Sequence, residues 1–212
     1  MPYLVLLTSL LLAACSTAYY GALEKVGFHK RDILVHRIEK AREEQDEAKE
    51  QFQIALEKFS ALTQFHGGDL QDKYEELAAA YEASADKAEA VRKRIADIED
   101  VAEALFEEWQ EELAQYHDPS LRAQSARQLA DTRRRYQRLI AAMKRAAAKM
   151  DPVLAMFHDR VLFLKHNLNA RAIASLQGEL DQIKGDVTTL IKEMDRAIAE
   201  ADSFIRAMQK EN

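Results

Sequence analysis

The chain is poor in the residues that cross-link or interrupt a fold. It has one cysteine in 212 residues, which excludes an intramolecular disulfide framework. Six glycines and three prolines are few. Because both residues disfavour helix interiors, their scarcity favours long uninterrupted helices. Apolar residues make up 48% and charged residues 31%, so the chain can bury a core. A net charge of −6 gives no general reason to expect a nucleic-acid partner.

No apolar run is long enough to span a bilayer, but a short one begins the chain. Residues 4–12 are apolar except at Thr8 and Ser9, whereas a transmembrane helix needs about 20 apolar residues. A short apolar stretch followed by small residues is typical of a secretory signal and its cleavage site. We therefore expect residues 1–14 to be a signal peptide.

The end of this stretch, Leu12-Ala13-Ala14-Cys15, resembles the lipobox of bacterial lipoproteins. The resemblance implies cleavage before Cys15 and diacylation of that cysteine, and two acyl chains anchor a protein stably where one is marginal. The residue after the cysteine is Ser16, which implies that the protein is located in the outer membrane and faces the periplasm. An Asp at this position would imply retention in the inner membrane. Met1-Pro2-Tyr3 lacks the positive charge usual in signal peptides, which a start codon assigned too far downstream would explain. The alternative is an apolar first helix with a buried cysteine.

Beyond residues 15–29, which we interpret as a lipidated tether, apolar residues recur at alternating spacings of four and three. This heptad pattern predicts helices over about 30–65, 70–116, 120–166 and 172–210. Gly67-Gly68 and Pro119 mark the first two turns. Short turns make consecutive helices antiparallel. The predicted fold class is all-α: an elongated antiparallel bundle of four long coiled-coil-like helices within residues 30–212.

Proline and glycine residues could interrupt the third and fourth predicted helices. Asp151-Pro152 reads as a helix start, yet the apolar pattern keeps its phase across Pro152. We therefore expect a kink there, with a break as the alternative. Gly178 and Gly185 lie off the apolar pattern and soften the fourth helix locally.

Charges are distributed unevenly around the Pro119 turn. Residues 97–118 contain nine acidic residues and no Lys or Arg, whereas residues 120–149 contain nine basic residues against Asp131 alone. Folding the hairpin back would set acid against base, so we expect cross-helix ion pairs here. The basic run Arg133 to Arg138 is therefore interpreted as a salt-bridge face, with anionic lipid or cell-wall polymer second and nucleic acid not expected.

Helix lengths predict which end of the bundle carries the Pro119 turn. The second and third helices are each about ten residues longer than the first and fourth. In an up-down-up-down bundle this surplus lies at the Pro119 turn, at the same end as residue 30. A tip bearing Trp109, Tyr116 and His117 would then lie on the membrane-proximal side and face a partner.

The sequence contains no recognisable set of catalytic residues. None of the six histidines belongs to a His-Glu-x-x-His or Glu-x-x-His motif, and there is no phosphate-binding loop, dinucleotide fingerprint or nucleophile elbow. We expect no metal, no cofactor and no catalytic residue. The alternative is a ligand- or metal-binding, or enzymatic, bundle with a site near Pro152 and the Asn167-to-Asn169 break. Its candidate residues are Asp151, His158, His166 and Asn167.

Two stretches carry a family resemblance. They are Tyr19 to Gly27, continuing through His29 to Asp32, and Phe163 to Ala172. Together they resemble a family of Gram-negative bacterial lipoproteins of unknown function, over nearly all of the mature chain. The resemblance implies an exported, lipid-anchored, all-helical protein, and it brings no catalytic residues.

These observations favour a non-enzymatic envelope protein. We expect a rod, held at the membrane through lipid on Cys15, that spaces, scaffolds or binds an unknown envelope protein or cell-wall polymer. A third interpretation treats the apolar faces as intermolecular and makes the protein a coiled-coil oligomer. The sequence leaves the oligomeric state open.

Overall fold

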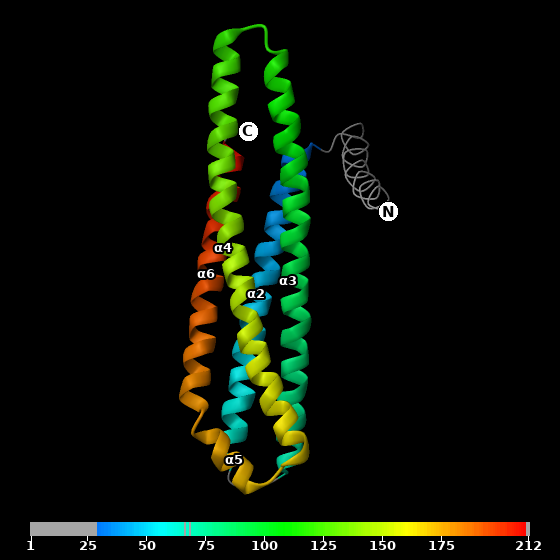
Figure 1. Cartoon of the computed structure of the whole chain (residues 1–212), viewed down its shortest axis with the longest axis vertical. Helices are drawn as coiled ribbons and strands as arrows, with labels where there is room; N and C mark the ends of the chain where they lie inside the picture. The colour runs from blue at the N-terminus through cyan, green and yellow to red at the C-terminus, as the bar shows by residue number, and fades with distance from the viewer. Residues whose placement is uncertain (1–28, 66, 68, 211–212) are drawn as a thin grey trace, which may run out of the picture.

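The computed structural model describes residues 29–65, 67 and 69–210, and these form a rod of long helices (Figure 1). The elements are α2 (Lys30–Thr63), α3 (Leu70–Glu112), the 3-10 helix η1 (Leu113–Gln115), α4 (Pro119–His166), α5 (Ala170–Gln177) and α6 (Leu180–Lys210). Cys15, the expected signal peptide and all of the expected tether except His29 lie outside the described residues. None of the described helices combines the length and the apolar character that crossing a membrane requires.

The long helices form a closed antiparallel bundle. α2 packs against α3 and α6, and α4 packs against the same two helices, so α2 and α4 lie diagonally opposite. Consecutive long helices run in opposite directions along the rod (Figure 1). The predicted fold class, an all-α antiparallel helical bundle, is confirmed.

The core follows the heptad pattern closely. Every position at the alternating spacings of four and three is buried from Leu34 to Leu62 of α2, and so is every one from Ile173 to Met208 of α5 and α6. Phe59 of α2 and Phe157 of α4 meet edge to face across the bundle, with ring centroids 6.3 Å apart. One continuous apolar interior therefore joins all the long helices. The fully buried large side chains are Leu34, Ile38, Phe52, Phe59, Leu62, Leu77, Ile98, Leu139, Met143, Met150 and Phe157.

Polar residues interrupt this core at a few points. Ser84 is fully buried and its hydroxyl donates to the Ala80 carbonyl at 2.8 Å. Gln45, also fully buried, and Thr132, 1% exposed, have no side-chain hydrogen-bond partner among the described residues. Each such group costs stability, because it gives up water without receiving a partner.

Side-chain caps fix the helix starts. Asp69, Asp118 and Asn169 each accept hydrogen bonds from the backbone N–H groups of the first turn of α3, α4 and α5, respectively. Gly67, between α2 and α3, has φ 131°, a conformation that favours glycine. Gly67 and Pro119 therefore lie at the turns that the sequence predicted.

α4 runs through Pro152 as one helix, so the alternative of a break is wrong. Proline removes the N–H that would bond to the carbonyl of Ala148. Both Pro152 and Ala148 are exposed, so water can serve that carbonyl. Met150 and Val153 on the inner face stay buried, and their packing holds the helix together.

The fourth predicted helix is instead two helices, which corrects the expected span of 172–210. α5 ends at Gln177 and α6 begins at Leu180. The Glu179 carboxylate receives two hydrogen bonds from the Arg160 guanidinium of α4, at 3.0 and 2.5 Å, and so holds the joint. α5 also packs against α2 at the end of the bundle (Figure 1). The change of direction lets Ile173 and Leu176 stay buried while closing that end.

Candidate functional site

The α3/α4 hairpin projects past the other helices at the end where α2 begins (Figure 1). Lys30, the first residue of α2, donates from Nζ to Glu108 Oε1 at 2.9 Å, near the end of α3. Arg31 donates to the Met208 carbonyl near the end of α6 at 2.8 Å. The Pro119 turn therefore lies at the same end as residue 30, as the helix lengths predicted. We call residues 109–121 the hairpin tip.

The inner side of the hairpin has its own packing. The Trp109 indole N–H donates to Ser125 Oγ at 2.8 Å and so ties α3 to α4. Leu113 and Leu129 are buried between the two arms. Trp109 is partly buried and packs at this junction, so of the three tip residues predicted to face a partner it is the least available.

The outer side of the tip presents a small apolar surface. Tyr116 is 41% exposed and Leu121 is 51% exposed, and His117 lies exposed between them in the chain. Asp118 caps α4, and its hydrogen bonds from Ser120 and Leu121 lower the pKa of its carboxyl. Sequence reasoning missed Leu121. The available signal was a large apolar side chain in the first turn of a helix that extends beyond its neighbours.

Tyr136 lies next to the tip, where α4 meets α3. Its ring packs edge to face on Phe106, with centroids 5.3 Å apart. The Arg133 guanidinium lies 5.5 Å from the centre of the Phe106 ring. Burial, followed by the charges of Glu99 and Glu103, raises the pKa of Tyr136 to about 12. The phenol therefore acts as a packed aromatic at neutral pH and not as a base.

The residues of the alternative site do not converge. Asp151 pairs with Arg92 of α3, and the amide of Asn167 donates to the Phe163 carbonyl. His158 stacks at a tilt against Tyr81, with centroids 5.6 Å apart, and His166 is exposed in the last turn of α4. Among the described residues there is no group of three His, Cys, Asp or Glu arranged to hold a metal ion. The geometry gives these four residues separate local roles.

A pocket of about 380 Å³ lies at the opposite end from the tip. It forms between the α2–α3 turn and α5, and its side chains carry no ionisable group. It can take an apolar group, but it offers only a hydroxyl and an amide for hydrogen bonding. Its lining is Thr63, Phe65, Gly67, Leu70, Ala170, Ile173, Ala174 and Gln177.

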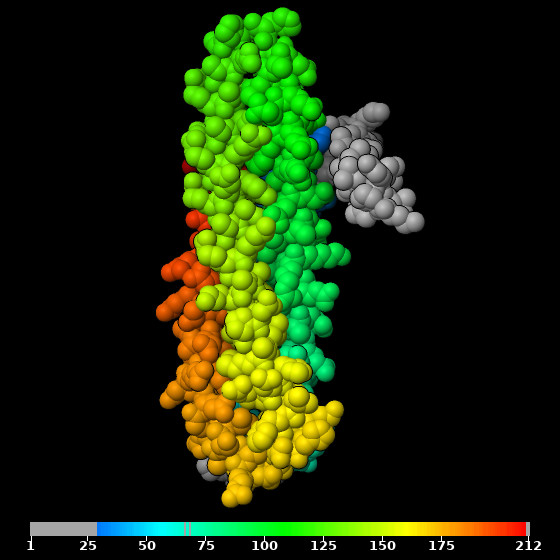
Figure 2. All heavy atoms as spheres, viewed as in Figure 1, coloured from blue at the N-terminus to red at the C-terminus, as the bar shows by residue number. Residues whose placement is uncertain are grey.

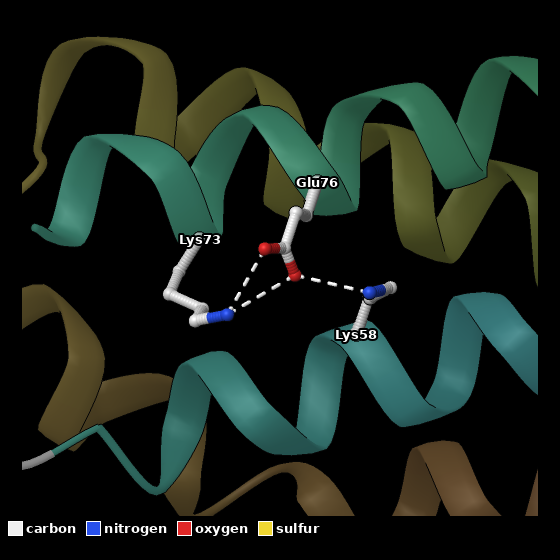
Figure 3. Close-up of polar contacts among 3 residues, drawn as sticks. All are labelled: Lys58, Lys73 and Glu76. Atoms are coloured by element: carbon white, nitrogen blue, oxygen red, sulfur yellow. Dashed lines mark hydrogen bonds and ion pairs between the residues drawn. The ribbon is translucent and has the colours of Figure 1, made fainter.

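A charge network clasps α2 to α3 near this end (Figure 3). The Glu76 carboxylate receives hydrogen bonds from Lys73 Nζ at 3.0 and 3.2 Å and from Lys58 Nζ at 3.1 Å. The hydrogen bond from Lys73, followed by that from Lys58, lowers the pKa of Glu76. Two cations on one carboxylate make a structural clasp and leave no free acid or base.

The basic residues of α4 make the expected salt bridge across the hairpin at Lys144, while others pair elsewhere. Lys144 pairs with Glu99 across the hairpin at 2.5 Å, as predicted. Arg134, however, pairs with Asp131 within α4, and Arg145 faces Glu193 of α6 at 3.9 Å. Arg133 also reaches α3, donating to the Phe106 carbonyl at 2.9 Å, so the α4 cations divide between α3, α6 and α4 itself.

The comparisons with known proteins come to one match. No curated protein and no solved structure matches the chain. A family model described as "Protein of unknown function (DUF2959)" matches residues 19–208. Since this match covers most of the chain, the protein belongs to that family of unknown function.

Proposed function

We propose that the protein is a lipid-anchored cell-envelope rod whose hairpin tip binds a partner. The observation that carries the proposal is the projection of the α3/α4 hairpin at the end where the N-terminal segment joins the bundle. An acylated Cys15 would attach to this end through residues 16–29. The tip would then extend from the attached end, and the rest of the bundle would act as a spacer.

The bundle geometry supports a scaffolding role. The apolar faces of the long helices are buried against one another within a single chain, so closing the core needs no second copy. This arrangement counts against the coiled-coil oligomer. The ionisable residues of the alternative site are spread along the exposed surface of α4, so we do not propose that site.

Acyl labelling tests the anchor. Cells expressing the wild type or Cys15→Ser would be fed a clickable palmitate, and the purified chains would be compared. We expect label on the wild type, absence of label on Cys15→Ser, and loss of that variant from the outer-membrane fraction. Equal labelling of the two chains would refute lipidation at Cys15.

Site-specific photocrosslinking tests the tip. A photoreactive phenylalanine analogue would replace Tyr116 in one strain and Leu162, which is 51% exposed on the other half of α4, in a second strain. We expect a discrete crosslinked species from position 116 and none from position 162. The same species from both positions, or none from 116, would contradict a tip-specific partner.

A further inference from the structure

Five cations follow one line along α4. They are spaced seven, four, seven and four residues apart, which keeps them on one face of a helix. The line extends over 22 residue steps, or about 33 Å at 1.5 Å per step. We call this set the cationic stripe: Arg127, Arg134, Arg138, Arg145 and Lys149.

The stripe runs beside the junction of α4 with α6, on the side away from α3. Arg134, Arg138 and Arg145 line an open groove of about 470 Å³ together with Gln137, Ala141 and Glu200 of α6. Figure 2 shows α4 running between α6 and α3 along this face of the molecule. The groove is a surface channel and not an enclosed cavity.

The stripe is short of intramolecular partners. Arg127, Arg138 and Lys149 are exposed and have no hydrogen-bond or ion-pair partner among the described residues. Arg134 and Arg145 pair with carboxylates, yet their side chains remain 65% and 60% exposed. Their positive charge therefore remains available to a ligand.

This arrangement costs the helix stability. Arg134 and Arg138 are four residues apart, and so are Arg145 and Lys149. Like charges at this spacing repel and destabilise a helix. Asp131 offsets part of this repulsion by pairing with Arg134, and between Arg134 and Lys149 no acidic residue of α4 lies on the stripe. An anion bound along the stripe would offset this repulsion.

We propose that the cationic stripe binds a linear acidic polysaccharide. Four of the five groups are guanidinium ions, which bind carboxylate and sulfate oxygens through two parallel hydrogen bonds. The cations average one per about 8 Å along the helix. One sugar unit is roughly half that long, so the spacing matches every second acid group of a linear polymer with one acid group per sugar.

Other polyanions fit the stripe less well. Duplex DNA carries one charge per about 1.7 Å, far more densely than the stripe. Single-stranded nucleic acid binds through aromatic platforms, and the stripe contains no aromatic side chain. A flat anionic membrane would also meet the carboxylates beside the stripe, those of Asp131, Glu193 and Glu200, which repel it. A narrow linear polymer can follow the cations and avoid these groups. The inference does not depend on the lipid anchor.

The test measures binding of the purified full-length chain to fluorescent oligogalacturonate, which has one carboxylate per sugar. The triple variant Arg127→Gln, Arg138→Gln, Lys149→Gln removes only cations without internal partners. The matched control, Lys93→Gln, Arg171→Gln, Lys184→Gln, removes the same charge from exposed residues off the stripe. We expect the stripe variant to lose about tenfold or more in affinity, and its log–log salt dependence to become shallower by about two. The control should lose much less.

Two further measurements separate the stripe from general electrostatics. Glu200→Gln removes the carboxylate in the groove, so it should tighten binding. The stripe variant should melt no lower than the wild type without ligand, because it loses repulsion and no ion pair. Equal loss in the stripe and control variants, no binding to oligogalacturonate, or tighter binding to single-stranded DNA or to phosphatidylglycerol vesicles would overturn the proposal.

Discussion

At the scale of single residues, the core contains polar groups that the fold does not satisfy. Gln45 is fully buried on α2, and neither polar atom of its amide has a hydrogen-bond partner among the described residues. The apolar spacing predicted that residue 45 would face the core, and it does. Sequence alone could not show whether a neighbouring helix would offer the amide a partner, because that depends on how four helices align in register.

Replacing this glutamine should stabilise the protein. Gln45→Met keeps the length and shape of the side chain and removes two buried polar atoms. We expect the free energy of unfolding to rise by about 1–3 kcal/mol, measured by urea denaturation. Gln53→Met, at an exposed position of α2, is the control and should change stability little. A loss of stability in Gln45→Met would mean that the amide is satisfied in solution.

Glu76 makes stability depend on pH. Its lysine partners lower its pKa below the ordinary value of 4.5, so the folded state binds fewer protons than the unfolded state. The stabilisation is therefore present above pH 4.5 and is lost as the pH falls through the pKa of the folded state. Glu76→Gln lacks this contribution, so its stability should fall less steeply between pH 5 and about pH 3. Urea denaturation across this range checks the slope, with Glu82→Gln as the control. Identical slopes in wild type and Glu76→Gln would rule the effect out.

At the scale of helices, the sequence predicted the elements well and their joints less well. The expected bounds of the first three helices lie within four residues of the observed ones, because glycine, proline and capping side chains mark those ends. The split between α5 and α6 was missed because the apolar spacing continues in phase across it. The bend depends on Arg160 of α4 holding Glu179, a contact between helices that no local pattern reports.

Two glycines should respond to replacement by alanine with opposite changes in stability. Gly185 lies inside α6, and a methyl group added there would meet nothing within 4 Å. Gly185→Ala should therefore raise the free energy of unfolding by about 0.5–1 kcal/mol. Gly67 has φ 131°, so Gly67→Ala should lower it despite the open space around it. Thermal denaturation of both variants checks the opposite signs, and a shared sign would contradict this account of the turn.

The hairpin should depend on the bond between Trp109 and Ser125. Ser125→Ala removes the acceptor of a half-buried indole N–H, which should cost about 1 kcal/mol. Trp109 is the single tryptophan of the chain, so its fluorescence reports on the hairpin alone. We expect a red-shifted emission and stronger quenching by iodide in Ser125→Ala. Unchanged emission would show that packing alone holds the indole. Ser120→Ala, at the exposed start of α4, is the control for emission.

At the scale of the whole molecule, the helix lengths predicted which end of the bundle projects. They did not predict which side chains pair on its surface. Helix lengths suffice for the first because a closed bundle must place any surplus at one end. The extent of the expected acid–base face could not be predicted, because pairing depends on which neighbouring helix each flank of α4 meets. Arg145 meets α6 and Lys144 meets α3, although they are adjacent in the chain.

The projecting tip should be separable from the bundle. α2 begins level with Glu108, so residues 109–126 lie largely beyond the four-helix core. Replacing them with a turn of about six Gly and Ser residues should leave a folded helical protein that unfolds cooperatively. Circular dichroism during thermal denaturation measures this, and the full chain is the reference. Loss of the cooperative transition would show that the tip is needed for folding.

Because α3 and α4 are longer than α2 and α6, the rod extends by different lengths on the two sides of Lys30, where α2 begins. From the level of Lys30, the hairpin reaches about 10 Å one way, counting the seven residues from Trp109 to Gln115. The 34 residues of α2 reach about 50 Å the other way. A body held at residue 29 is therefore an asymmetric lever. A small rotation of the tip against a partner would sweep the far end, with its apolar pocket, through roughly five times that displacement.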